Sequence, residues 1–210
     1  LKNNYAIRCF INAIYIIMLT NLKKYNIILA SKSPRRQELL KGIGIEFSIL
    51  TKEVDESYSK NISVFDVAPF LSLKKAKAFE ETELPENYLV ITADTVVIVD
   101  DKILGKPKDA ADARNMLRLI SGKKHSVVTG VTIRTAERIK TFSVASKVSF
   151  DVLDEDEIEY YVCEYKPFDK AGSYGIQEWI GYIGVNNVEG SYFNVMGLPT
   201  HKLYQMLKKF

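Results

Sequence analysis

One long apolar segment, "NYLVITADTVVIV" at residues 87–99, limits what this chain can fold into. It is rich in β-branched residues, and the "DD" that follows at 100–101 indicates a turn into a short return strand. Asp94 interrupts the segment, and burying a carboxylate alone costs roughly several kcal/mol. We therefore expect Asp94 to be ion-paired, metal-bound or at a cleft. The alternative is an Asp that satisfies backbone N–H groups at a bulge. Thr95 should point to the opposite face, where strand propensity alone would explain it.

Strands and helices alternate along the rest of the chain, with two long strands adjacent in the middle. Strands are predicted at 26–30, 45–50, 124–135 and 139–151. Helices are predicted at 34–41, 64–81, 109–121, 154–165 and 198–210, and Pro69 favours a start of the second one near Ala68. Residues 170–195 are rich in Gly, Asn and aromatic side chains, so loops and short strands are expected there. This pattern predicts an α/β fold with a mixed sheet.

The segment "LASKSPRRQELL" at residues 29–40 marks the change from the first strand to the first helix. Ser33 suits an N-cap and Pro34 the first helical position. A helix start presents unpaired N–H groups, and the neighbouring hydroxyls, Lys and Arg side chains would make this turn a seat for phosphate. The alternative is a capped surface helix whose Arg residues are solvated.

Three more charged residues are candidates for a phosphate or metal site. Lys106 lies between Gly105 and a proline, on a rigid turn. Lys77 has alanine neighbours on a predicted helix, which would let it reach into a cleft. Glu56 lies in the acidic loop "EVDES", where carboxylates without histidine favour a hard cation such as Mg²⁺. A solvated lysine and a plain acidic loop are the ordinary alternatives.

The segment "DKAGSYGIQEW" at residues 169–179 combines a charge pair, two glycines and an amide. The glycines suggest a close approach of the backbone to another group. Gln177 offers a donor and an acceptor that could pair with the edge of a nucleotide base. The alternative is a structural turn with packed aromatic side chains.

Length and composition exclude several classes of protein. The 210 residues fit one domain, and 29 basic against 26 acidic residues leave no strongly basic region for nucleic acid. The two cysteines form no disulfide or zinc pattern and fit a reducing compartment, so we expect a cytoplasmic protein. No Walker loop, nucleophile elbow or zinc signature is present.

The first residues need a separate interpretation. An apolar stretch runs from Cys9 to Leu19 but is too short to cross a membrane. It resembles part of a signal peptide, yet no small-residue cleavage site follows. We expect residues 1–17 to be an upstream extension and residues 18–210 to form a single domain, with a targeting segment as the alternative.

Taken in order, the motifs "LASKSPRRQELL", "VDE", "KAKA", "ADTVV", "LGKPKD", "DKAGSYGIQ" and "EGSYFNVMGLP" resemble those of the Maf family, the septum formation inhibitor-like proteins. The resemblance covers residues 26–208. It implies a nucleoside triphosphate pyrophosphatase that releases a nucleoside monophosphate and pyrophosphate. It also implies an elongated mixed sheet in two lobes around a cleft, like that of inosine triphosphate pyrophosphatases.

The resemblance assigns roles to individual residues. Asp94 matches the proton acceptor, and Glu56 matches the acidic residue that would hold a divalent cation, Mg²⁺ or Mn²⁺, with Asp94. A metal-bound Asp is a weaker base, so both roles of Asp94 stay open. The positions expected to hold the triphosphate are Ser31, Arg36, Lys77 and Lys106. The positions that separate the branches of the family are Arg35, Thr95 and Gln177.

These branch positions resemble the branch that acts on dTTP and UTP. The 7-methyl-GTP branch differs at Arg35 and Gln177 and remains an alternative. A nucleotide-binding inhibitor of cell division without catalysis is a second alternative. The expected partner is a nucleoside triphosphate, not a nucleic acid or a membrane, and a homodimer stays open.

Overall fold

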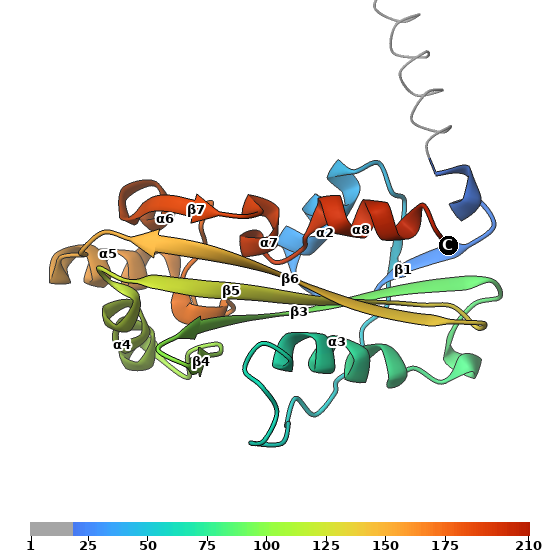
Figure 1. Ribbon diagram of the computed structural model, residues 1–210, viewed down its shortest axis with the longest axis horizontal. Helices are drawn as coiled ribbons and strands as arrows, with labels where there is room; N and C mark the ends of the chain where they lie inside the picture. The colour runs from blue at the N-terminus through green and yellow to red at the C-terminus, as the bar shows by residue number, and fades with distance from the viewer. Residues whose placement is uncertain (1–18) are drawn as a thin grey trace, which may run out of the picture.

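A seven-stranded mixed sheet runs the length of the molecule (Figure 1). The computed structural model describes residues 19–210, so the expected extension at residues 1–17 lies outside the described residues. The strands are β1 (Asn26–Leu29), β2 (Ser48–Ile49), β3 (Tyr88–Val99), β4 (Lys102–Leu104), β5 (Lys124–Arg134), β6 (Ile139–Phe150) and β7 (Val185–Glu189). Their order is β2-β1-β3-β5-β6-β7, with β4 also paired to β3. β1 is parallel to β2 and β3, and the other pairs are antiparallel. The predicted mixed α/β sheet is therefore confirmed.

Helices cover both faces of this sheet. They are α2 (Pro34–Gly42), α3 (Val67–Lys77), α4 (Ala110–Ile120), α5 (Glu155–Tyr165), α6 (Trp179–Gly184), α7 (Tyr192–Met196) and α8 (Thr200–Leu207). Short 3₁₀ turns lie at η1 (Thr20–Leu22), η2 (Glu81–Glu83) and η3 (Ala171–Ser173). In Figure 1, α3 lies on one face and α2 and α8 lie on the other. None of the helices within residues 19–210 has the length and apolar character needed to cross a membrane.

Strand β3 is buried almost throughout because both of its faces are covered. Val96 and Ile98 pack with Leu71 of α3, whereas Leu89 and Ile91 pack with the leucines of α2 and α8 on the other side. Burying each such side chain contributes about 1.5–3 kcal/mol. The continuous apolar segment read from the sequence is thus a central strand between two helical layers.

One edge of β3 is only partly paired. β1 pairs with it over Tyr88–Ile91 and β4 over Val97–Val99, while β5 occupies the opposite edge over 90–98. Among the described residues, no strand pairs with the first edge between residues 92 and 96. This gap leaves the part of β3 that carries Asp94 without a neighbouring strand on that edge.

Gly130 brings α3 close to the same place. It pairs with Asp94 across β3 and β5. A Cβ atom at Gly130 would lie 2.2 Å from the backbone nitrogen of Pro69 and 2.3 Å from the carbonyl carbon of Ala68. The first turn of α3 therefore packs directly on the sheet beside Asp94, which only a residue without a side chain allows.

Two local expectations needed correction. The strand predicted at 45–50 is reduced to Ser48–Ile49, both exposed. Residues 170–195, predicted as loops and short strands, also contain helices α6 and α7. Their short apolar faces become helical through packing, which local composition does not reveal. Pro69 lies in the first turn of α3, where its missing N–H costs no helical hydrogen bond.

Candidate active site

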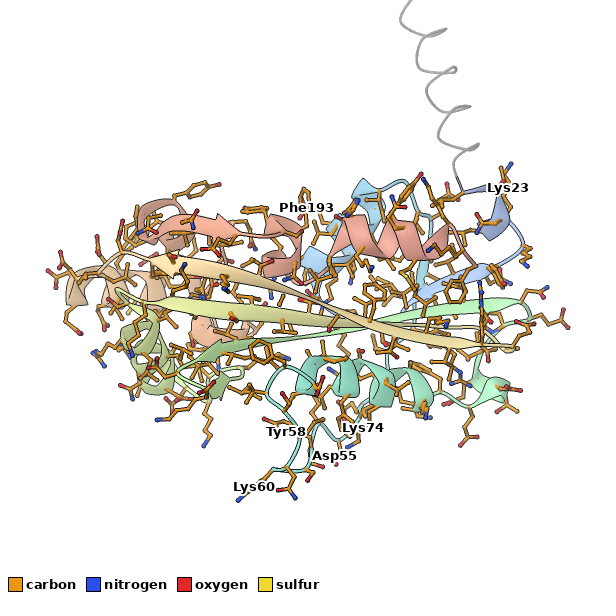
Figure 2. The ribbon with its side chains drawn as sticks, viewed as in Figure 1. Lys23, Asp55, Tyr58, Lys60, Lys74 and Phe193 are labelled. Atoms are coloured by element: carbon orange, nitrogen blue, oxygen red, sulfur yellow. The ribbon has the colours of Figure 1, made fainter. Side chains whose placement is uncertain are left out.

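A cleft of about 800 Å³ opens at the gap in the edge of β3. Ligand pockets for small molecules commonly occupy roughly 300–1,000 Å³. The β1–α2 turn, the loop before α3, α3 itself, β3 and the turn after β4 all contribute to its wall. The segment 169–177 closes the remaining side. Figure 2 shows the loop before α3, with Asp55, Tyr58 and Lys60, extending away from the sheet.

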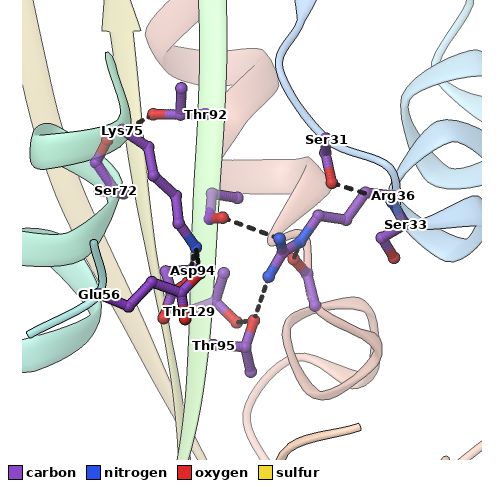
Figure 3. A network of polar contacts seen from close by, with 12 residues as sticks. Ser31, Ser33, Arg36, Glu56, Ser72, Lys75, Thr92, Asp94, Thr95 and Thr129 are labelled. Atoms are coloured by element: carbon purple, nitrogen blue, oxygen red, sulfur yellow. Dashed lines mark hydrogen bonds and ion pairs between the residues drawn. The ribbon is translucent and has the colours of Figure 1, made fainter. Parts of the chain in front are cut away.

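An ion-paired group occupies the α3 side of the cleft. Asp94, only 8% exposed, accepts a hydrogen bond from Lys75 of α3. The same Lys75 ammonium lies 2.8 Å from Oε1 of Glu56 (Figure 3). Partial burial raises the pKa of Glu56, but the ion pair with Lys75 and the charge of Lys106 outweigh it and lower that pKa. One ammonium is thus shared by two carboxylates, and it gives the buried carboxylate of Asp94 a partner of opposite charge.

A second polar group occupies the opposite face of β3. Arg36 donates from Nε to the Gly197 carbonyl at 2.9 Å and from Nη1 to the Ala93 carbonyl at 2.8 Å. Its Nη2 donates to Thr95 Oγ1 at 3.0 Å, and that hydroxyl also contacts the Thr129 hydroxyl at 2.9 Å. The Ala93 carbonyl belongs to the unpaired edge of β3. Arg36 therefore donates a hydrogen bond to a β3 carbonyl that no neighbouring strand pairs with. It also connects α2 to the residue that follows α7.

Asp94 points from one face of β3 and Arg36 of α2 contacts the other face, yet both side chains line the cleft (Figure 3). The expected alternation of Asp94 and Thr95 is confirmed, since Thr95 contacts Arg36 and Asp94 contacts Lys75. Burial lowers the pKa of Arg36, and the charge of Asp94 partly opposes this shift. The two groups thus interact around the edge of the strand.

The β1–α2 turn provides the hydroxyl groups. Ser31 is buried, and its Oγ accepts a hydrogen bond of 3.2 Å from the backbone N–H of Ser33. Ser33 occupies the N-cap position of α2, but its own side chain makes no capping hydrogen bond. Ser31, Ser33 and Arg35 all line the cleft, which places the start of α2 at its wall.

Lys106 and Gln177 also line the cleft, from the turn after β4 and from the segment before α6. The two segments are joined by a hydrogen bond of 3.0 Å from the Gly172 N–H to the Gly105 carbonyl. Oε1 of Gln177 is buried and has no hydrogen-bond partner among residues 19–210. A buried acceptor without a donor is unfavourable, so a ligand with an N–H group would be stabilised there.

Comparison with known proteins agrees with this geometry. Residues 26–210 match the family of Maf-like proteins. The chain belongs to the Maf family. It is 53% identical over 193 residues to the dTTP/UTP pyrophosphatase of Bacteroides thetaiotaomicron, covering 91% of this chain and 100% of that protein. It is 51% identical over 195 residues to the dTTP/UTP pyrophosphatase of Porphyromonas gingivalis, covering 92% and 98%.

A structural comparison finds the Ham1 protein of Staphylococcus aureus, with a TM-score of 0.44 and 16% identity over 60% of this chain and 71% of that one. A likeness this low establishes nothing about the site.

The cleft of this Maf chain contains all but one of the residues expected from its motifs. Eight of them line it: Ser31, Arg35, Arg36, Glu56, Asp94, Thr95, Lys106 and Gln177. The exception is Lys77, which is exposed and lies in a separate hollow beside Tyr88 and Arg134.

Lys75, rather than the predicted Lys77, is the lysine of α3 that lines the cleft. Residues two apart on a helix point about 200° apart, so only one of them can face Asp94. The prediction for Lys77 was therefore wrong. A signal was available, because Lys75 continues the buried stripe of Ala68, Leu71 and Ser72 at helical spacing.

The Maf cleft offers oxygen ligands suited to a hard cation. Within residues 19–210, no group of three or more His, Cys, Asp or Glu side chains is arranged to hold a metal. Glu56 and Asp94 nevertheless converge on one ammonium group. Mg²⁺ commonly takes one or two carboxylates together with substrate phosphates, so this pair fits it.

Proposed function

We propose that this chain is a dTTP/UTP pyrophosphatase, which hydrolyses the bond between the α- and β-phosphates and releases a nucleoside monophosphate and pyrophosphate. The observation that carries the proposal is that Asp94 lies in one cleft with Lys75, Arg36 and Lys106. The names of relatives at about half identity support the choice of substrates.

The triphosphate would lie across the unpaired edge of β3, which lines the cleft. The N-terminus of α2 offers N–H groups and the Ser31 and Ser33 hydroxyls, and Lys106 offers a cation. Arg36 uses one N–H on each of its nitrogens within the protein, which leaves one on each terminal nitrogen for a phosphate oxygen. These fixed donors would stabilise charge that develops on the phosphates during cleavage.

Asp94 would accept the proton of the attacking water. Lys75 holds the carboxylate in place, and the opening of the strand edge lets water reach it. General base catalysis contributes about 10²–10⁴-fold, so positioning and charge stabilisation provide the rest. Glu56 and Asp94 would hold a Mg²⁺ or Mn²⁺ ion, which when bound supplies further positive charge for the phosphates.

The base would be selected at the end of the cleft that holds Gln177. Uracil and thymine carry an N–H flanked by two carbonyl groups, which complements a carboxamide. The buried, unpartnered oxygen of Gln177 would accept that N–H. Arg35 and Thr95 are the other two residues that we assign to specificity. We place the enzyme in the cytoplasm, which the free, exposed thiol of Cys163 supports.

A nucleotide panel tests this proposal. Purified protein is incubated with Mg²⁺ and dTTP, UTP, CTP, GTP or 7-methyl-GTP, and pyrophosphate release is measured. We expect cleavage of dTTP and UTP, and cleavage of 7-methyl-GTP alone would place the chain in the other branch.

Asp94→Asn separates catalysis from binding. Hydrolysis should fall by about 10²-fold or more while nucleotide binding is retained, since the amide keeps the shape but cannot act as a base. Full activity in this variant would contradict the assigned role of Asp94. Binding without any hydrolysis by the wild type would instead favour a nucleotide-binding regulator.

A further inference from the structure

A chain of ion pairs begins at Arg35, on the first turn of α2. Arg35 Nη1 lies 2.8 Å from Oδ2 of Asp169, which belongs to the segment before η3. The side chains are 21% and 57% exposed. Partial burial raises the pKa of Asp169, but hydrogen bonds from Lys170 and Arg35 outweigh it and lower that pKa. This pair joins two separate segments of the cleft wall.

Lys170 extends this series of ion pairs into the interior of the protein. It is only 7% exposed, and its Nζ lies 2.8 Å from Oδ1 of Asp169 and 3.0 Å from Oε1 of Glu178. A lysine is rarely buried without a specific partner. Here both partners are carboxylates of its own segment, so its charge is compensated within the wall of the cleft.

Glu178 connects this lysine to the backbone beside Gln177. The Tyr161 hydroxyl donates to Oε2 of Glu178 and accepts a 3.0 Å hydrogen bond from the N–H of Gly175. Burial, and then the contact with Glu178, raise the pKa of fully buried Tyr161. A Cβ at Gly175 would lie 2.8 Å from Cδ of Glu178, so the glycine makes room for the carboxylate.

The series of ion pairs and hydrogen bonds therefore begins at Arg35. It ends at Gly175 and Glu178, which lie on either side of Gln177 in the sequence. The buried charged residue of this series is Lys170, and any displacement that separates its ammonium from the two carboxylates would leave a buried charge without its partners. Such an arrangement holds geometry better than it stabilises the fold. Arg35 and Gln177 are two of the residues assigned above to base specificity.

We propose that Asp169, Lys170 and Glu178 form a positioning relay that fixes Arg35 and Gln177 relative to one another and so sets the base selectivity. The relay rests on the proposed hydrolysis of dTTP and UTP. These three residues do not act on the phosphates. They control where the base is held, so their loss changes KM and selectivity and leaves the chemical step intact.

Two variants test the two ends of the relay. Asp169→Asn removes the charge that holds Arg35 at a side chain that is 57% exposed, and the buried Lys170 keeps Glu178 as its carboxylate partner. The KM for dTTP and UTP should rise roughly tenfold with kcat changed less than about threefold, since a charge-assisted hydrogen bond is lost. Glu178→Gln removes the charge beside Gln177, so the Gln177 carboxamide is no longer held in one position. The preference for UTP over CTP in kcat/KM should then fall roughly tenfold, because a mobile carboxamide no longer rejects a nucleotide base that lacks the N–H group.

Glu159→Gln is the matched control. The Arg114–Glu159 pair has nearly the same exposure, 24% and 54%, but joins α4 to α5 away from the cleft. This variant should keep the wild-type KM, kcat and selectivity.

The outcomes separate the relay from the function. If the wild type cleaves dTTP and UTP but both relay variants keep its KM and its UTP preference, the relay is refuted and the function stands. A fall in kcat alone, with KM and selectivity unchanged, refutes it too. If the wild type leaves dTTP and UTP intact, the proposed function fails, and the relay with it. Should Glu178→Gln not fold, Asp169→Asn alone decides.

Discussion

Replacing His125 should change how the stability of the protein depends on pH. His125 lies on β5, is 2% exposed and packs against Phe150, with its ring centroid 5.6 Å from the phenyl centroid. Its Nε2 lies 2.7 Å from the Tyr174 hydroxyl, and its Nδ1 has no hydrogen-bond partner within the described part of the chain. Burial lowers the pKa of His125 from 6.5 to about 4, because the charged ring has no compensating carboxylate.

The sign of the effect follows from this lowered pKa. In the unfolded chain the histidine binds a proton near its ordinary pKa of 6.5, whereas the folded protein keeps it neutral down to about 4. Folding is therefore unaffected above the unfolded pKa and is progressively weakened as the pH falls between these two values. The full difference corresponds to ~3 kcal/mol. Between about pH 7.5 and about pH 5, ~2 kcal/mol of it is lost.

Urea unfolding, followed by the fluorescence of the single tryptophan Trp179, measures this loss. The variant His125→Gln stays neutral and can still bond to Tyr174. Its free energy of unfolding should fall by ~2 kcal/mol less than that of the wild type between about pH 7.5 and about pH 5. His201→Gln, at an exposed position, should match the wild type. An equal fall in His125→Gln and wild type would refute the argument.

Four further substitutions test the architecture of the cleft, and Lys77→Met is the control for Lys75→Met. Lys75→Met should lower kcat for UTP hydrolysis by about 10²-fold or more, since two carboxylates lose their shared cation, whereas Lys77→Met should leave kinetics unchanged. Equal effects of the two would contradict the assignment to Lys75. Arg36→Lys should lower the melting temperature and raise KM, because one ammonium cannot reach three separate acceptors. Gly130→Ala should lower the free energy of unfolding by ~2 kcal/mol or more in urea titrations, since α3 must move off the sheet; an unchanged value would show that the contact is not tight.

Much of the fold follows from local patterns. The apolar segment around Asp94, the turn at residues 100–101 and the return strand are all present as predicted. The helix predicted after Asp109 begins there, and the Asp109 side chain caps it by accepting from the Asp112 N–H at 2.8 Å. These features depend on residues close together in sequence, which is why sequence patterns report them.

The sequence did not show as readily which side chains of α3 face the sheet. The motif "KAKA" contains two lysines with alanine neighbours, and composition does not distinguish them. What distinguishes them is which face of the helix packs on the sheet, and that is set by the contact between Ala68 and Gly130, 62 residues later in the chain. The charge pair of Asp169 and Lys170 was noted in the sequence, but the ion pair between Lys170 and Glu178 was not predicted, because Glu178 was read as part of a loop rather than as the residue before a helix.

The shared cleft of Asp94 and Arg36 depends on the same kind of long-range information. In a complete sheet, neighbouring residues on one strand face different layers, and a ligand could not contact both. Here neither β1 nor β4 pairs with residues 92–96 of β3, so the two layers meet at an unpaired strand edge. A triphosphate crossing that edge would contact the carboxylates and Lys75 on one side and Arg36 on the other. The proposed catalysis in this cleft therefore depends on the gap in strand pairing as much as on any single side chain.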